Sequence, residues 1–585
     1  MKTKNLIDSA MARKKADIVL KGGKYVNVYT KELLKSDIVI TDSKIVYVGL
    51  ESNDFEGPDT QTILLKDEII CPGLIESHIH IESSMLTLTE FSKAVIPRGT
   101  TTLVIDPHEL ANVTGIPGLN FLIEESKSLP IRFLIEAPSC VPSLTGFETS
   151  GAVIDENAIE ELMSRNEIFA LAEMMNYPGV FLGFDDVISK IDSAKKHKKL
   201  VEGHAPLVKG RELQAYIAAG VSSDHEATSS EEVLEKLRLG MKLQVRQGSY
   251  AKDLERIFSG LKATDIDTRN ILMASDDRNP IDLKDEGHLD YTYRLLIKNG
   301  VQPLEAIQMM TINTATHLGL QDVLGGIAPG KNADLIIVDN LEDFNVQTVI
   351  ANGNILYDNE KLIWNQDPVT YPDFILDTVK KLTIPTREEL EIQSSEMKET
   401  EVHVIGVEDH SLITKKLTAI LKVENGIIQP DLNNDILPIV IVNRHTDEIK
   451  IGKGFVKGLG LKEGALASTV AHDSHQLICA GTDYDLMLKA IEIIKELKGG
   501  QVVVTRNKVT SLQLNFAGIM SIKSLDEVVG NTKKLHKAVF ELEPKVSEPF
   551  MALAFIALPV IPHLKVTDHG LVDVDNFKII QPEIK

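Results

Sequence analysis

Between residues 69 and 320 the chain alternates short apolar segments with amphipathic ones, and no other feature of the sequence restricts its fold so strongly. Helical patterns of period 3.6 lie between the apolar segments, as at Asn157–Ser164 and Gly210–Ala219. Eight strand-and-helix units over this length fit a closed (β/α)8 barrel better than an open doubly wound sheet. The segments predicted as strands are Cys71–His80, Thr101–Asp106, Arg132–Glu136, Ile168–Glu173, Lys199–His204, Gly220–His225, Lys242–Arg246 and Asn270–Asp276.

Short strands and tight turns on both sides of this region predict a second unit. Residues 16–65 have the pattern of a small antiparallel β unit, and residues 326–357 repeat it, with Asn352-Gly353 as a hairpin signal. Neither part is long enough to bury a core alone. We therefore expect the two parts to form one β-sandwich into which the barrel is inserted.

The rest of the chain is expected to fold separately. Residues 367–397 carry prolines and charges without strong apolar strands, which predicts a linker followed by one helix. Beyond it, a strand at Leu437–Val442 and a helix at Tyr484–Lys498 indicate an α/β domain. The predicted division is 1–68 and 323–370 for the sandwich, 69–322 for the barrel, and 371–585 for the linker and C-terminal α/β domain.

Length and charge narrow the classes of function. At 585 residues the chain is too long for one core. Its net charge of -23 argues against a nucleic acid partner, whose phosphates would be repelled, and favours a small molecule. No apolar run reaches the length of a membrane span, and Met1–Asp8 lacks the apolar core of a secretory signal. We expect a cytoplasmic protein without a membrane partner.

The first predicted strand ends in His78-Ile79-His80. Side chains at i and i+2 of a strand point to the same face, so both imidazoles can reach one metal ion. Two unrelated surface histidines are the plain alternative, but metal sites of (β/α) barrels lie at such strand ends. Cysteine ligands are not expected, because Cys71, Cys140 and Cys479 lie far apart and form no Cys-x-x-Cys pair.

Four further strands end in a residue that can bind a divalent cation. Each alone is more often a polar residue entering solvent, but parallel strands of a barrel all end on one rim, so jointly they are stronger evidence. These groups suit one or two borderline divalent ions such as Zn, Mn, Fe(II) or Co, which lower the pKa of bound water. A bridging carboxylate would hold two ions close, and Glu173 is the candidate. The four residues are Glu173, His204, His225 and Asp276.

This ligand pattern resembles the amidohydrolase superfamily, which has His-x-His on the first strand, a carboxylate or lysine on the fourth, and His, His and Asp on later strands. More narrowly, the chain resembles the bacterial adenine deaminases over nearly its full length, including a C-terminal domain that most superfamily members lack. The stretches that carry this resemblance are Pro72–Ser84, Asp106–Glu109, Ala172–Asn176, Glu202–Ala205, Ala274–Arg278 and Ala471–His475.

The resemblance implies hydrolysis of adenine to hypoxanthine and ammonia, a step of purine salvage, at a site with two Mn or Fe(II) ions, although Zn would also suit the ligands. Attack of a metal-activated hydroxide at C6 requires protons for the ring nitrogen and the departing amine. We assign this proton shuttle to Asp276, shared by Glu173 if Glu173 does not bridge. A homo-oligomer, with a dimer as its simplest form, is also expected. The implied ligand set is His78, His80, Glu173, His204, His225 and Asp276.

Four residues are weaker candidates for contact with the substrate or with the ligands. His108 follows the second strand and could touch metal or substrate. Glu226 could protonate the ring, but it directly follows an inward ligand, so strand alternation predicts that it points away. His472 and His475 belong to the predicted C-terminal domain and could cover the barrel mouth, or could simply stabilise a turn.

Two other functions remain open from the sequence. A cyclic-amide hydrolase of the same superfamily often carries a carbamylated lysine on the fourth strand, where this chain has Glu173. A non-catalytic assembly protein with a barrel fold would have lost ligands, whereas all six positions are filled here. The zinc deaminases with His-x-Glu and Pro-Cys-x-x-Cys motifs are excluded, because neither motif is present.

Overall fold

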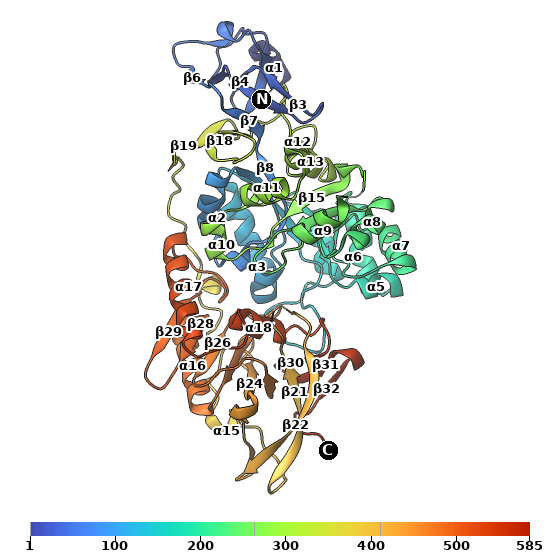
Figure 1. The fold of residues 1–585 in the computed structure, drawn as a ribbon, viewed down its shortest axis with the longest axis vertical. Coiled ribbons are helices and arrows are strands. Elements are labelled where there is room, and N and C mark those ends of the chain that lie inside the picture. Colours follow the sequence, from blue (N-terminus) through green and yellow to red (C-terminus); the bar gives the residue numbers. More distant parts are fainter. Residues whose placement is uncertain (1, 263, 410) are drawn as a thin grey trace.

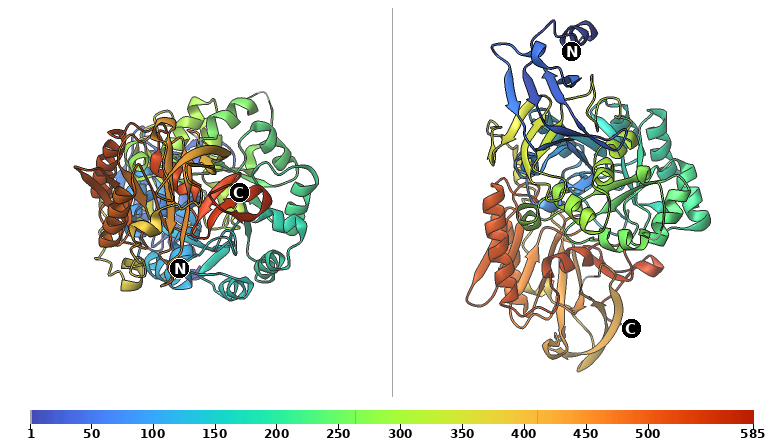
Figure 2. Two further views of the ribbon diagram at one scale, coloured as in Figure 1. Left: turned by 90° about the horizontal axis from the view of Figure 1, so that it is seen from below. Right: turned by 45° about the horizontal axis from the view of Figure 1, so that its top comes forward.

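The computed structural model describes residues 2–262, 264–409 and 411–585, and it arranges them as three bodies stacked along one axis (Figure 1). A β-sandwich at the N-terminal end leads into a barrel, and the C-terminal domain lies at the far end of that barrel. The right view in Figure 2 shows the same stacking. Within the described residues, no helix is both long and apolar enough to cross a bilayer.

Eight parallel strands form the barrel. They are hydrogen-bonded in the order β12-β11-β10-β9-β8-β16 and β13-β14-β15, with β15 and β16 together making the eighth strand. Two contacts close the cylinder: Asp276 pairs with Ile79, and the Ser222 amide donates to the Val201 carbonyl at 2.9 Å. The predicted (β/α)8 barrel is thus confirmed. Its strands are β8 (Leu74–His80), β9 (Thr100–Ile105), β10 (Arg132–Ala137), β11 (Ile168–Met174), β12 (Val201–Gly203), β13 (Ser223–Asp224), β14 (Lys242–Arg246), β15 (Ile271–Ala274) and β16 (Asp276–Asp277).

Amphipathic helices surround these strands and begin at capping residues. The Asp155 carboxylate accepts the Ala158 amide at the start of one helix, and Ser229 accepts the Glu232 amide at another. Their apolar faces join the main hydrophobic core. The helices are α2 (Leu88–Val95), α3 (His108–Lys127), α4 (Glu156–Ser164), α5 (Tyr177–Leu182), α6 (Asp185–Lys196), α7 (Gly210–Ala219), α8 (Ser230–Arg238), α9 (Leu254–Leu261), α10 (Pro280–Asp285), α11 (Leu289–Lys298), α12 (Pro303–Met309) and α13 (Ile312–His317).

The N-terminal sandwich contains strands from both sides of the barrel. One sheet has the order β5-β4-β1-β6, and the other has the order β20-β19-β18-β17-β7-β2-β3. Its strands are β1 (Ile18–Lys21), β2 (Lys24–Asn27), β3 (Glu32–Lys35), β4 (Asp37–Thr41), β5 (Lys44–Gly49), β6 (Gln61–Leu64), β7 (Ile69–Pro72), β17 (Leu335–Val338), β18 (Val346–Ala351), β19 (Asn354–Asp358) and β20 (Lys361–Leu362).

The first part of the sandwich is not purely antiparallel, so that expectation was wrong. Strand β1 pairs with β6 in parallel, and β2 pairs with β7 in parallel. Parallel neighbours need a long crossover connection, and the intervening strands β3 to β5 supply it. Because β7 runs directly into β8, the barrel strands start at the sandwich and end facing the C-terminal domain (Figure 1).

The linker carries two single-turn helices, α14 (Asp373–Leu376) and α15 (Arg387–Leu390), where one longer helix was predicted. Pro372 and Pro385 interrupt any longer run, because proline cannot continue a helix. A nine-stranded sheet follows, in the order β23-β22-β21-β25-β24-β27-β26-β28-β29, with a separate sheet of β30, β31 and β32. The helices in the described part of this domain are α16 (Tyr484–Leu497), α17 (Leu525–Phe540) and α18 (Pro549–Ile556).

The strands of this domain are β21 (Glu399–Gly406), β22 (Lys415–Glu424), β23 (Ile427–Ile428), β24 (Ile436–Val442), β25 (Ile451–Lys457), β26 (Ala465–Ser468), β27 (Leu477–Gly481), β28 (Gly500–Val504), β29 (Val509–Gln513), β30 (Leu564–Thr567), β31 (Gly570–Asp573) and β32 (Lys578–Ile580). The domain docks on the barrel through backbone and core contacts. Ser521 donates its amide to the Met85 carbonyl at 2.9 Å, and Phe516 and Met520 join the core of the barrel.

Candidate metal centre

The six side chains predicted as ligands meet at the ends of the barrel strands that face the C-terminal domain. His78 and His80 lie on β8, Glu173 on β11 and Asp276 on β16, while His204 and His225 directly follow β12 and β13. All are buried except His204, which is partly exposed. We call these six residues the cage.

The two histidines of β8 face the aspartate of β16. His78 Nε2 lies 3.2 Å from His80 Nε2. Asp276 Oδ1 lies 3.6 Å from His78 Nε2 and 3.2 Å from His80 Nε2. Three ligand atoms therefore surround one point on this side of the cage.

Glu173 lies between the two sides of the cage. Its Oε1 is 3.3 Å from His80 Nε2. Its Oε2 is 2.7 Å from His204 Nδ1 and 3.1 Å from His225 Nε2. One carboxylate thus presents one oxygen to each side, which is the arrangement of a ligand that bridges two ions.

The donor atoms fit metal ligands by distance and by protonation. Ligands at about 2.1 Å from a tetrahedral ion lie roughly 3.4 Å from one another, and several cage distances are close to this value. His80 Nδ1 lies 2.9 Å from the Asp106 carbonyl, which can only accept, so Nδ1 carries the proton. The lone pair of His80 Nε2 therefore points into the cage, opposite another imidazole nitrogen.

The electrostatics of the cage favour positive charge at its centre. Burial by itself raises the pKa of the Glu173 carboxyl, but His225 and His204 hold that pKa well below its usual value. Burial lowers the pKa of His225, yet Glu173 and Asp276 outweigh it and raise that pKa to about 9. Buried carboxylates that stay ionised beside imidazoles are the environment in which divalent cations bind.

A layer of buried acids beneath the cage fixes the ligand strands. Glu76 Oε1 accepts the amides of His78 and Ser275, which ties β8 to the eighth strand. Glu202 accepts His317 Nε2 at 2.8 Å and the Ser223 hydroxyl, which ties β12 to β13. Each acid precedes a ligand histidine by two residues, so strand alternation could have revealed both from the sequence.

Arg246, at the end of β14, is a residue that the sequence gave no reason to choose. Its Nη1 donates to Asp276 Oδ2 at 3.1 Å and also to Glu226 Oε1, and its Nη2 donates to Asp253. The guanidinium therefore holds the oxygen of Asp276 that faces away from His78 and His80. A strand-end arginine has no spacing pattern that sets it apart, so only the fold identifies it.

Glu226 faces the cage, contrary to the expectation that it points away. Its Oε1 lies 3.5 Å from His225 Nε2 and 3.8 Å from His204 Nδ1. Strand β13 ends at Asp224, so the alternation of strand side chains does not extend to Glu226.

His108 also lies beside the cage. Its Nδ1 is 3.4 Å from Asp106 Oδ2 and 3.6 Å from Glu173 Oε1. Both residues can complete a metal-binding group with His80 and Glu173. Asp106 was not predicted as a ligand, although it directly follows β9, as His204 and His225 directly follow β12 and β13.

The remaining two candidates reach the barrel mouth from the C-terminal domain. His472 Nδ1 lies 3.2 Å from Glu109 Oε1, and His475 Nε2 lies 3.6 Å from Glu109 Oε2. Both contact the first turn of α3 rather than the cage itself.

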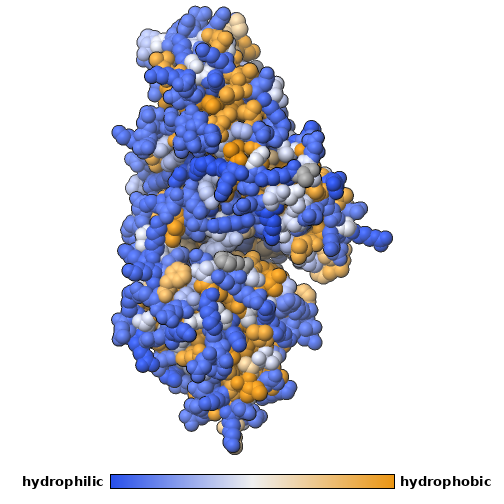
Figure 3. Space-filling view, viewed as in Figure 1, coloured by the Kyte–Doolittle hydropathy of each residue, from blue (hydrophilic) through white to orange (hydrophobic). Residues whose placement is uncertain are grey.

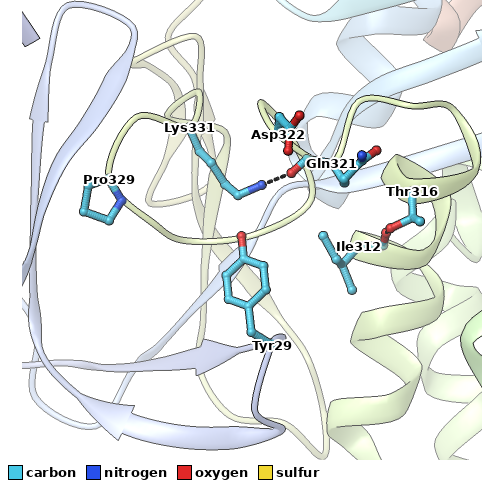
Figure 4. Close-up of a pocket in the computed structure, with 7 residues that line it drawn as sticks. All are labelled: Tyr29, Ile312, Thr316, Gln321, Asp322, Pro329 and Lys331. Atoms are coloured by element: carbon cyan, nitrogen blue, oxygen red, sulfur yellow. Dashed lines mark hydrogen bonds between the residues drawn. The ribbon is translucent and has the colours of Figure 1, made fainter.

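A surface pocket of about 410 Å³ lies away from these residues, where the sandwich meets α13 (Figure 4). Its Lys331 ammonium is already bonded to carbonyls, and no cage residue lines it.

Two family models match this chain, one in each half. Residues 69–356 match the amidohydrolase family, and residues 411–578 match the adenine deaminase C-terminal domain. The chain is 39% identical over 584 residues to an adenine deaminase of Methanococcoides burtonii, covering 100% of this chain and 98% of that protein. It is 43% identical over 559 residues to an adenine deaminase of Methanothermobacter thermautotrophicus, covering 95% and 98%. An adenine deaminase of Clostridium acetobutylicum is 39% identical over 578 residues, covering 98% and 99%.

Proposed function

The chain belongs to the adenine deaminase family of amidohydrolases, an enzyme family that converts adenine to hypoxanthine and ammonia, and we propose that it does so with two divalent transition-metal ions held by the cage. The observation that carries the two-ion proposal is Glu173, whose two oxygens face separate groups of imidazoles. His78, His80 and Asp276 would hold one ion, and His204 and His225 the other. Such ions supply hydroxide at neutral pH by lowering the pKa of water.

The chain's own groups then have to move protons and hold the substrate. Asp276 is the proposed shuttle: its Oδ1 faces the cage, while Arg246 holds its Oδ2 and so fixes the direction of Oδ1. Arg246 is a positioning residue in this scheme. Glu173 is not free to shuttle protons, because both of its oxygens face ligand imidazoles.

The groups beside the cage can orient a purine. Glu226 and His108 lie on different sides of Glu173 and carry a carboxylate and an imidazole within hydrogen-bonding reach of a ring placed there. Water loss strengthens such contacts, and the cage is buried beneath the docked C-terminal domain. A flat, polar heterocycle is the class of substrate that these donors and acceptors suit.

The choice of metal is a finer part of the proposal. Imidazoles with carboxylates suit Mn(II) and Fe(II) as well as Zn(II). The experiment is to strip the protein with a chelator, reload it separately with each ion, and measure ammonia release from adenine together with metal per chain. We expect no activity in the stripped protein, and recovery that saturates at two ions per chain. Saturation at one ion would refute the bridging role of Glu173.

The same panel separates the alternatives. Turnover of dihydrouracil in place of adenine would favour a cyclic-amide hydrolase, for which a fourth-strand lysine rather than Glu173 is typical. Failure of every reloaded form to act on adenine, adenosine, cytosine or guanine would revive the non-catalytic reading.

Location and assembly complete the proposal. All three cysteines are free thiols, which suits a reducing compartment, and we propose the cytoplasm.

The homo-oligomeric state of the protein stays a prediction, which sedimentation velocity would test. The domain boundaries at residues 68, 322 and 370 stay predictions as well, which limited proteolysis would test.

A further inference from the structure

The C-terminal domain inserts one segment, residues 471–476, against the mouth of the barrel. His472 contacts Glu109 on α3, and Gln476 Nε2 donates to the Thr149 carbonyl in the loop after β10 at 2.6 Å. The same loop donates the Thr149 amide to Asp568 at 3.0 Å. Figure 3 shows a notch in the outline where the barrel meets the C-terminal domain. The segment is therefore held in place from both sides.

Within this segment, Asp473 is buried without enough partners. The residue is 3% exposed. Its Oδ1 lies 3.8 Å from His472 Nδ1 and 4.0 Å from His108 Nε2, and its Oδ2 has no hydrogen-bond donor among the described residues. A buried acceptor left unpaired costs about 1 to 3 kcal/mol, and more when it is charged. Such an atom is expected to receive its donor from a bound molecule.

His108 connects Asp473 to the cage. One ring nitrogen, Nδ1, lies 3.6 Å from Glu173 Oε1, while the other, Nε2, faces Asp473. A single imidazole ring thus separates the bridging carboxylate from the free oxygen of Asp473. A bicyclic heterocycle that reacts at the cage can extend over the same distance.

We propose that Asp473 is a substrate-binding residue whose free oxygen accepts a hydrogen bond from the N–H of the five-membered ring of adenine. This inference rests on the proposed function. A carboxylate oxygen that lacks a donor can accept a hydrogen bond, and this N–H is the one donor of adenine outside the reacting amino group. A nucleoside carries its sugar on this ring and lacks the donor. Asp473 would therefore select the free base, because any substrate without the N–H leaves a buried carboxylate unpaired.

The neighbouring group of Glu109, His472 and His475 is a second cluster of buried titratable side chains at the barrel mouth. Its atoms are close enough to hold a cation. The Ala471 amide, however, donates to His475 Nδ1 at 3.2 Å, which leaves the ring proton on Nε2, toward Glu109. His475 then has no lone pair to offer a cation, and its Nε2 has no hydrogen-bond partner among the described residues.

The test compares adenine with 9-methyladenine, which has no N–H on that ring. In the metal-loaded full chain, Asp473→Ala should lower kcat/KM for adenine roughly 10- to 100-fold, mainly through KM. The loss on 9-methyladenine should be much smaller, and metal per chain should stay unchanged. Asp568→Asn is the matched control, because Asp568 is a buried acid of the same domain that bonds the barrel away from the cage. It should leave the preference between the two bases as in the unmodified protein.

Three outcomes would overturn the proposal: equal losses on both bases, an unchanged KM for adenine, or loss of metal in both Asp473→Ala and Asp473→Asn. Failure of the unmodified protein to act on adenine would instead refute the proposed function. In that case calorimetric binding of hypoxanthine, which keeps the ring N–H, still decides. Equal affinity in the unmodified protein and in Asp473→Ala would refute the role of Asp473.

Discussion

Asp276 is a cage residue whose backbone conformation is strained. Its φ of 56° lies in the left-handed region, which costs a non-glycine residue about 1 to 2 kcal/mol. Pairing of Asp276 with Ile79 and the bonds from Arg246 hold it there. Backbone strain held by surrounding contacts is a feature of active sites.

Substitution of this carboxylate tests its proposed role as a proton shuttle. Asp276→Asn should lower kcat for adenine about 10²- to 10⁴-fold, because general acid–base groups contribute factors of this size. Circular dichroism should show an unchanged fold. Asp253→Asn is the control, since it removes the charge of another partner of Arg246 that is not a cage residue. A near-normal rate in Asp276→Asn would contradict the shuttle role.

Lys565 is a buried residue of β30, in the C-terminal domain, whose charge affects stability. Its side chain is fully buried, and Nζ donates to the carbonyls of Leu412 and Phe555, both at 3.0 Å. Burial lowers the pKa of Lys565 to about 7 from 10.5. The unfolded chain therefore binds one proton more than the folded chain between these two values.

The sign of the pH dependence follows from this difference. Stability should rise with pH from about 7 toward 10.5, by at most about 1.4 kcal/mol per pH unit from this group. Lys565→Met should remove that part of the slope, measured as the unfolding midpoint between pH 7 and 9.5. The exposed Lys578→Met in the same small sheet serves as the control and should leave the slope intact. An identical slope in Lys565→Met would show that Lys565 is not neutral in the folded protein.

At the scale of elements, two cage residues, His204 and His225, directly follow the very short neighbouring strands β12 and β13. Gly203 ends β12 directly before His204, and its amide lies 3.1 Å from the Ser223 hydroxyl. A Cβ at Gly203 would lie 2.1 Å from the Ser223 carbonyl oxygen, which is backbone and cannot move aside alone. The close approach of these strands therefore requires glycine.

Gly203→Ala should destabilise the protein by roughly 1 to 3 kcal/mol, the usual cost of overpacking. It should also weaken metal binding, because His204 would move with the strand. Thermal unfolding and metal content measure the two effects. Gly530→Ala in α17 is the control: nothing lies near its Cβ, and alanine favours a helix, so stability should not fall. Full metal content and unchanged stability in Gly203→Ala would contradict this account of β12 and β13.

For the whole molecule, the barrel is enclosed at both ends by other parts of the chain. The sandwich contributes β7, which enters the first barrel strand, and the C-terminal domain contributes Phe516, Met520 and residues 471–476. The cage is buried because the third body covers the mouth of the second (Figure 1). In the proposed role of Asp473, the C-terminal domain adds a substrate contact to a cage whose ligands all lie on the barrel.

The sequence by itself determined the properties that depend on neighbours along the chain. Apolar alternation predicted the eight strands, and strand geometry placed His78 and His80 on one face, because both depend on backbone periods of a few residues. It missed the parallel pairing of β1 with β6 and the positions of Glu226 and Arg246. Only the tertiary structure decided these, together with the contact of Asp473 with His108. Barrel closure and domain docking set distances between segments hundreds of residues apart, and no local period encodes them.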